Sequence, residues 1–301
     1  EGPRAKRLKA PKVSHIKGLM DGLKGQLEST PRVIYELSQT VMKDMGRNPD
    51  YVSSFQAPSS ILNQRVSSSR RFAAQSFEFA RLAHIAKELG VTINDIVLAI
   101  CSGALREYLI SQNALPKKPL IAMVPASVRT DDSDMSNRIT MILANLGTHK
   151  EDPLERLKIV RRSVLNAKER FKRMNANQIL NYSAFVYGAA GLNIASGLMP
   201  KRQAFNLVIS NVPGPREPLY WNGAKLEALY PASVVFDGQA LNITLTSYLD
   251  KLEVGIVACR NTLPKVQSLL MLLEQEIQNY ERHLGTVSIS EEQKADLKHV
   301  G

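Results

Sequence analysis

Cysteine is scarce in this chain, because only Cys101 and Cys259 occur among its 301 residues. Two cysteines cannot build a disulfide scaffold, and no Cys or His spacing typical of a metal site is present. Each cysteine lies inside an apolar run. The sequence therefore predicts two small buried side chains in a reducing compartment, and it predicts no metal site.

Long hydrophobic runs are also missing. The best candidate, residues 174–200, has no charged residue before Lys201 but contains five Asn or Gln residues and three glycines. A spanning helix needs about 20 predominantly apolar residues, so this stretch predicts a buried or surface-adsorbed helix instead. The basic N-terminus has no apolar stretch behind it, so we expect no secretory signal. A first residue other than Met, followed by a linker-like sequence, indicates that the chain begins within a longer protein.

Acidic residues are outnumbered, at 28 Asp and Glu against 39 Lys and Arg, which gives a net charge of +11. Such an excess suits nucleic acid, an anionic membrane surface or phosphorylated ligands such as coenzyme A. No array of stacking aromatic residues accompanies it, so we expect no nucleic-acid partner. The basic helix expected over 153–174 is compatible with an anionic membrane surface and equally with a solvated face.

Hydrophobic periodicity predicts an α/β protein. Expected strands cover 71–79, 120–124, 139–146, 206–210, 241–248 and 252–259, and expected helices cover 31–45, 80–89, 93–110, 153–174 and 264–284. This arrangement predicts a two-layer sandwich in which helices cover one face of a mixed β-sheet. We expect a basic linker and short helix over 1–56, one domain over 57–285 and a polar tail over 286–301.

Four short motifs follow one another along the chain. They are APSSILN at 57–63 followed by Arg70 and Arg71, TINDIVLA at 92–99, VPASVR at 124–129 followed by Asn137, and SNVPGP at 210–215 followed by LYWNGAKLEALYPAS at 219–233. In this order they resemble the bacterial wax ester synthase/diacylglycerol acyltransferase family. Each motif alone is a weak signal, but the four together indicate the C-terminal half of such an enzyme.

The resemblance implies a fold similar to chloramphenicol acetyltransferase and to peptide-synthetase condensation domains, with a substrate tunnel between two pseudo-equivalent halves. It implies that acyl-CoA is a substrate and that no cofactor is retained. The implied acceptor is a long-chain alcohol or diacylglycerol, and the implied partner is the N-terminal half of the same enzyme. The implied location is the cytoplasm, peripheral on the inner membrane or on lipid inclusions.

The catalytic motif of that family, HHxxxDG, is absent from this sequence. In the family a histidine of this motif acts as the general base that takes a proton from the alcohol. The five histidines here are never adjacent, and five residues separate His15 from Asp21 and Gly22 where the motif requires three. We therefore expect no catalytic residue in this chain and place the motif outside it.

The ND pair of TINDIVLA supplies the first candidate site residues. Asp95 is compatible with an active-site role at a helix N-terminus, but Thr92 and Asp95 also have the spacing of a capping box. Asn94 has no capping duty, so it is the better candidate to face the tunnel or brace the catalytic loop.

The other candidates belong to the two later motifs. Arg129 suits a coenzyme A phosphate or a local salt bridge, while Ser127 and Asn137 suit the tunnel or an ordinary turn. Ser210, Asn211, Pro213 and Gly214 suit either a tunnel wall or a tight turn in which backbone approaches closely. Two alternative functions stay open: a non-catalytic lipid- or acyl-CoA-binding module, and a complete enzyme that uses one of the five histidines.

Overall fold

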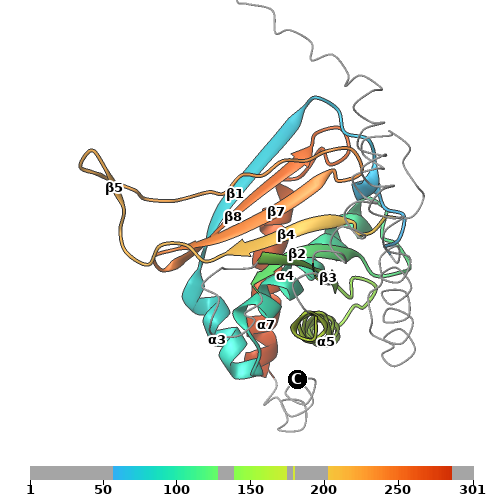
Figure 1. Ribbon diagram of the computed structural model, residues 1–301, viewed down its shortest axis with the longest axis horizontal. Coiled ribbons are helices and arrows are strands. Elements are labelled where there is room, and N and C mark those ends of the chain that lie inside the picture. The colour runs from blue at the N-terminus through green and yellow to red at the C-terminus, as the bar shows by residue number, and fades with distance from the viewer. Residues whose placement is uncertain (1–56, 128–138, 175–178, 180–202, 287–301) are drawn as a thin grey trace, which may run out of the picture. The chain divides into compact units, whose positions relative to one another are not determined.

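A mixed β-sheet of six strands lies at the centre of the computed structural model, which describes residues 57–127, 139–174, 179 and 203–286. The order of the strands is β1-β8-β7-β4-β2-β3 (Figure 1). They are β1 (Arg70–Glu78), β2 (Ile121–Ser127), β3 (Ile139–Asn145), β4 (Leu207–Val212), β7 (Leu241–Tyr248) and β8 (Lys251–Cys259). The adjacent strands β7, β4 and β2 run parallel, and the other pairs are antiparallel.

One face of this sheet is covered by the helices of the described part of the chain (Figure 1). They are α3 (Phe79–Leu89), α4 (Ile93–Ser111), α5 (Pro153–Lys172) and α7 (Ser268–Thr286), and a short 3-10 turn, η1 (Ile61–Asn63), precedes β1. The central helix α4 packs against α3, α5 and α7. The expected mixed sheet with a layer of helices is therefore confirmed.

Local sequence signals set several element ends. Gly90 ends α3 in the left-handed conformation, at φ 65°, and its backbone N–H caps the helix, as glycine commonly does. Asp152 caps the start of α5, where Pro153 occupies the first turn. The strands β7 and β8 pair in register from Tyr248 and Lys251 onward, which confirms the expected hairpin.

Several element boundaries differ from the sequence-based expectation. β2 continues to Ser127 where a strand over 120–124 was expected, and α5 ends at Lys172 where 174 was expected. β4 continues to Val212, so part of the SNVPGP motif lies within the strand and pairs with β7. The final helix begins at Ser268 and not at Pro264. The residues between form turns in which backbone N–H groups reach three residues back, as from Ser268 to Lys265. The expected helix at 31–45 and the uncharged stretch at 174–200 fall on residues outside the described ranges, apart from Met174 and Ile179.

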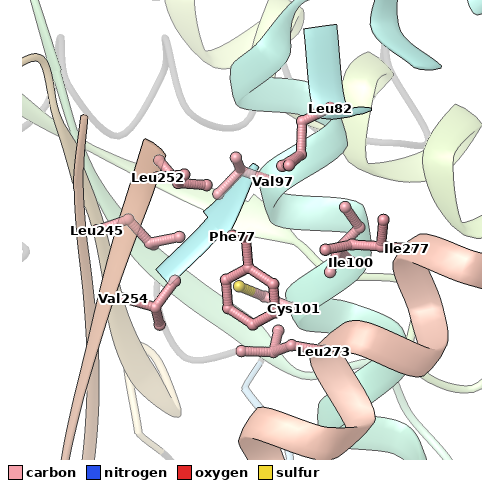
Figure 2. Close-up of a pocket in the computed structure, with 10 residues that line it drawn as sticks. All are labelled: Phe77, Leu82, Val97, Ile100, Cys101, Leu245, Leu252, Val254, Leu273 and Ile277. Carbon is pink, nitrogen blue, oxygen red and sulfur yellow. The ribbon is translucent and has the colours of Figure 1, made fainter. Parts of the chain in front are cut away.

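A small cavity lies in the core between the sheet and the helices, with a volume of about 10 Å³ (Figure 2). Its lining is apolar apart from one thiol, and consists of Phe77, Leu82, Val97, Ile100, Cys101, Leu245, Leu252, Val254, Leu273 and Ile277. A space of this size holds at most one water, and an apolar lining keeps it dry. It is a packing gap, far too small for an acyl chain.

Membrane-spanning potential is limited to one combination in the described residues. No single helix there is both long and apolar enough to cross a bilayer. Only α3 and α4 taken together have the required length and composition, and they meet at a bend of 104°.

Candidate active site

The carboxyl ends of three parallel strands meet at one edge of the sheet. β2 ends at Ser127, β4 at Val212 and β7 at Tyr248, and these strands are neighbours. In open α/β sheets, ligands bind outside the carboxyl ends of the strands. Two of the sequence motifs, VPASVR and SNVPGP, therefore leave the sheet at the edge where a ligand site is expected.

The ND motif reaches the same edge from the helix layer. Val97 of α4 lines the small cavity together with Leu245 near the end of β7 and Leu252 at the start of β8 (Figure 2). Asn94 lies one helical turn before Val97. The N-terminus of α4 is therefore close to the carboxyl end of β7, on the face that the helices cover.

Asp95 is committed to structure. Its Oδ2 accepts hydrogen bonds from the backbone N–H of Thr92 at 3.0 Å and from the Thr92 hydroxyl at 2.7 Å. In return, the N–H of Asp95 donates to the Thr92 hydroxyl at 3.2 Å. Arg161 of α5 lies 3.9 Å from the same carboxylate oxygen and also donates to the carbonyl of Gly90. The capping interpretation is confirmed. The carboxylate lies beside Arg161 of α5, and Arg161 in turn bonds to the C-cap residue of α3.

The side-chain amides of Asn94 and Asn211 lie at this edge without a hydrogen-bond partner among the described residues. Both residues are half-buried. Asn211 is in register with Leu245. Because residues that share register in a sheet share a face, Asn211 lies on the helix-covered side with Asn94. The structure therefore brings these two candidates to the same edge and the same face.

Ser210 lies on the opposite face of the sheet. It is in register with Thr244 of β7, and its neighbour in the chain, Asn211, faces the helices. The tunnel-wall role of Ser210 remains a prediction, as does that of the exposed Pro213. Ser127 is the last residue of β2, while Arg129 and Asn137 lie outside the described residues.

Gly214 is required by a close backbone approach within the protein itself. A Cβ at this position would lie 1.9 Å from the carbonyl oxygen of Ser247 and 2.8 Å from Oγ1 of Thr246. The N–H of Gly214 also donates to the Ser247 hydroxyl at 3.0 Å. Gly214 thus allows the SNVPGP turn to pack closely against the end of β7.

An aromatic arm, defined here as residues 216–226, follows the SNVPGP motif and was not expected from the sequence. It carries the two-stranded hairpin β5 (Tyr220–Trp221) and β6 (Ala224–Lys225), which projects away from the sheet (Figure 1). Asn222 and Gly223 both have positive φ, which gives the tight turn typical of Asn-Gly. Trp221 is 82% exposed and Tyr220 is 62% exposed. The Asn-Gly pair between Tyr220-Trp221 and Ala224-Lys225 was the signal that could have revealed it.

The base of the arm is fixed by a buried tyrosine. The hydroxyl of Tyr248 accepts from the N–H of Leu219 at 3.1 Å and donates to the carbonyl of Leu226 at 2.8 Å. The N–H of Leu226 donates to the carbonyl of Leu219 at 2.8 Å. The arm therefore leaves the protein from a defined hydrogen-bonded base.

Cys259 differs from the small apolar residue that the sequence suggests. Its buried sulfur accepts a hydrogen bond from the N–H of Ser67 at 3.3 Å. Burial raises the pKa of this thiol, but hydrogen bonds from Thr262 and Ser67 outweigh burial and lower the pKa to about 6. Cys101 follows the expectation, because burial raises the pKa of its thiol to about 12.

The described histidines are His84, His149 and His283, and none of their side chains makes a hydrogen bond to another described residue. The expectation that the catalytic histidine lies outside this chain stays a prediction. In the same part of the chain, no group of three or more His, Cys, Asp or Glu residues is placed to hold a metal ion.

Comparison with known proteins assigns both ends of the chain to one family. A model of the wax ester synthase/diacylglycerol acyltransferase catalytic domain matches residues 1–97, and a model of the WS/DGAT C-terminal domain matches residues 135–281. An O-acyltransferase WSD of Acinetobacter baylyi is 76% identical over 281 residues, which are 93% of this chain and 61% of that relative.

A solved structure gives the same result. The wax ester synthase/diacylglycerol acyltransferase of Marinobacter aquaeolei VT8 is 44% identical, with a TM-score of 0.70. The match covers 85% of this chain and 56% of that one, so the chain spans little more than half the length of this structure. The motifs, the fold and both comparisons agree: the chain belongs to the wax ester synthase/diacylglycerol acyltransferase family.

Proposed function

We propose that this chain is the C-terminal part of an acyl-CoA-dependent O-acyltransferase that esterifies long-chain alcohols or diacylglycerol. The observation that carries the proposal is the meeting of the family motifs at one sheet edge. There, the uncommitted amides of Asn94 and Asn211 lie on the same face, near the end of β7. Family membership supports the proposed reaction class, and the geometry of this edge supports the proposed location of the site.

The proposed reaction needs a base from outside the chain. A histidine of the HHxxxDG motif, located in the upstream part of the enzyme, takes the proton from the acceptor hydroxyl. The hydroxyl oxygen then attacks the thioester carbonyl of acyl-CoA, and coenzyme A leaves with the proton. Amide N–H groups are suitable donors to the oxygen on which negative charge develops, and we assign this task to Asn94 and Asn211.

The proposed partner of this chain is the N-terminal half of the same enzyme, with acyl-CoA and the acceptor bound between the halves. The aromatic arm supports this proposal, because a protruding hairpin that exposes Leu219, Tyr220 and Trp221 is unusual on a free surface. Aromatic residues of this kind are enriched at protein interfaces.

The proposed location is the cytoplasm, peripheral on the inner membrane or on lipid inclusions. Helix α5 supports a peripheral contact, since Arg162 and Lys172 are exposed along it and Arg173 is exposed at its C-cap. Basic helices of this kind are attracted to anionic lipid surfaces.

Release of coenzyme A from palmitoyl-CoA tests the proposal, with hexadecanol or dioleoylglycerol as acceptor. We expect no acceptor-dependent release by the 301-residue chain alone, and we expect release after addition of the upstream part of the Acinetobacter baylyi relative. Release by the chain alone would show that it holds its own base. Binding of palmitoyl-CoA without any release, even with the upstream part present, would favour a non-catalytic acyl-CoA-binding module.

A further inference from the structure

A carboxyl group is buried in an apolar stretch of β8. Glu253 lies in the sequence LEVGIVAC of β8 and is 0% exposed. No ion pair among the described residues includes it, and its Oε1 has no hydrogen-bond partner there. An uncompensated buried carboxyl group is costly, so its presence calls for a role.

The second oxygen of Glu253 begins a chain of hydrogen bonds that leads to the surface. The Ser76 hydroxyl donates to Oε2 at 2.5 Å, and the Ser76 and Tyr230 hydroxyls are 3.0 Å apart. A hydroxyl has a single proton to donate. Because Ser76 gives its proton to Glu253, the Tyr230 hydroxyl donates to Ser76.

Tyr230 belongs to the return segment, defined as residues 227–235, which leads from the aromatic arm back toward β7. This segment lies directly on the sheet, because a Cβ at Gly255 would be 1.7 Å from the carbonyl oxygen of Pro231. Its other end is held where Arg70 donates to the carbonyl of Val235 at 3.5 Å.

The outgoing limb, defined as residues 213–215 just before the arm, rests on the same row of residues as the returning limb, which is the return segment. Ser76, Glu253 and Thr246 are directly opposite one another on β1, β8 and β7. Gly214 of the outgoing limb packs against Thr246, and Tyr230 of the returning limb bonds to Ser76. Glu253 therefore lies between the supports of both limbs.

We propose that Glu253 is a positioning residue that acts through Ser76 and Tyr230 to fix the return segment, and so sets the direction in which the aromatic arm leaves the sheet. An effect of Glu253 on binding to the upstream half rests on the proposed docking of the arm there. The effect of Glu253 on the order of the arm base does not depend on that docking.

Hydrogen exchange at the Leu226 amide measures the order of the arm base directly. Tyr230→Phe removes only a partly exposed hydroxyl, so the fold is retained. Loss of a hydrogen bond of ordinary strength is expected to speed exchange of this amide about fivefold. Ser76→Ala should have the same effect, and the double variant should add little, because both residues belong to one chain of bonds.

Tyr220→Phe is the matched control, since it removes a hydroxyl from the same arm that has no hydrogen bond to a described residue. Its Leu226 exchange should equal that of the unmodified chain. Glu253→Gln retains an acceptor oxygen for Ser76 and should preserve slow exchange, whereas Glu253→Leu should lose it. Unchanged exchange in Tyr230→Phe and Ser76→Ala, unchanged exchange in Glu253→Leu, or equal acceleration in Tyr220→Phe would overturn the proposal.

A second readout separates this inference from the proposed function. The fluorescence anisotropy of Trp221, the only tryptophan of the chain, should fall in Tyr230→Phe without the upstream half present. Affinity for the upstream half should fall by a similar factor of about five, with kcat of the assembled enzyme retained. If the unmodified chain fails to bind that half, the proposed function fails, while exchange and anisotropy still decide the role of Glu253.

Discussion

Asn94 and Asp95 are neighbours in the chain but have different tasks. The Asp95 carboxylate accepts two hydrogen bonds from Thr92 and lies beside Arg161. The half-buried Asn94 side chain has no such commitment to a described residue. A family motif of two adjacent polar residues therefore combines one structural group with one group available to a ligand.

Replacement of each residue by alanine separates these tasks. Asn94→Ala should lower kcat of the assembled enzyme about 100-fold, the loss typical of one oxyanion donor, and leave the free energy of unfolding unchanged. Asp95→Ala should lower that free energy by about 1–2 kcal/mol, because the Thr92 N–H and hydroxyl lose the acceptor of their hydrogen bonds. Urea unfolding and coenzyme A release measure the two quantities. Normal turnover in Asn94→Ala would remove Asn94 from the site.

At the scale of elements, β4 and β7 are joined by more than their ladder of hydrogen bonds. Beyond the last pair, Val212 with Thr246, Gly214 lies against the backbone of Ser247 and bonds to its hydroxyl. The conformation of the SNVPGP turn thus depends on contact with a neighbouring strand.

Gly214→Ala should disrupt the contact between the SNVPGP turn and the end of β7, and so lower the stability of the fold. A Cβ 1.9 Å from a backbone oxygen cannot be accommodated without moving β4 or β7, and such overpacking costs about 1–3 kcal/mol. Gly285→Ala is the control, because a Cβ there would meet nothing within 4 Å. Thermal unfolding should show a lower Tm for Gly214→Ala alone. Equal Tm values for both variants would show that the turn moves freely.

At the scale of the whole molecule, the aromatic arm stands out among the described residues because it exposes two large aromatic side chains, Tyr220 and Trp221. Trp221 is 82% exposed at the tip of a hairpin whose base is fixed by Tyr248. A rigid base and an exposed aromatic tip suit an interface that is preorganised before docking.

Docking can be followed at a single atom. Chain produced with 5-fluorotryptophan carries fluorine only at position 221, because no other tryptophan is present. Addition of the unlabelled upstream half should shift and broaden the fluorine signal. Trp221→Ala should weaken binding about 30-fold, as for an interface hot spot. Met271→Ala, which alters a 67% exposed side chain of α7, should leave binding unchanged. A fluorine signal that does not shift on addition of the upstream half would place the interface elsewhere.

Local sequence signals predict most of the helices and strands. Capping signals at Gly90 and at Thr92 with Asp95 set the ends of α3 and α4, because caps depend on residues a few positions apart. Alternating and continuous apolar runs predicted the strands, and the four motifs indicated the family. The boundary of α7 was missed, since turns and the first turn of a helix share similar local bonds.

Tertiary structure decided which candidates meet and which are already occupied. Strand register placed Asn211 with Asn94 on one face and Ser210 on the other, and the packing of β7 gave Gly214 its partner. The hydrogen bonds of Cys259 and Glu253 also come from residues distant in the chain. The sequence by itself determined the family and the elements, whereas contacts between distant segments arise only when the sheet forms, because local preferences carry no information about which strands become neighbours.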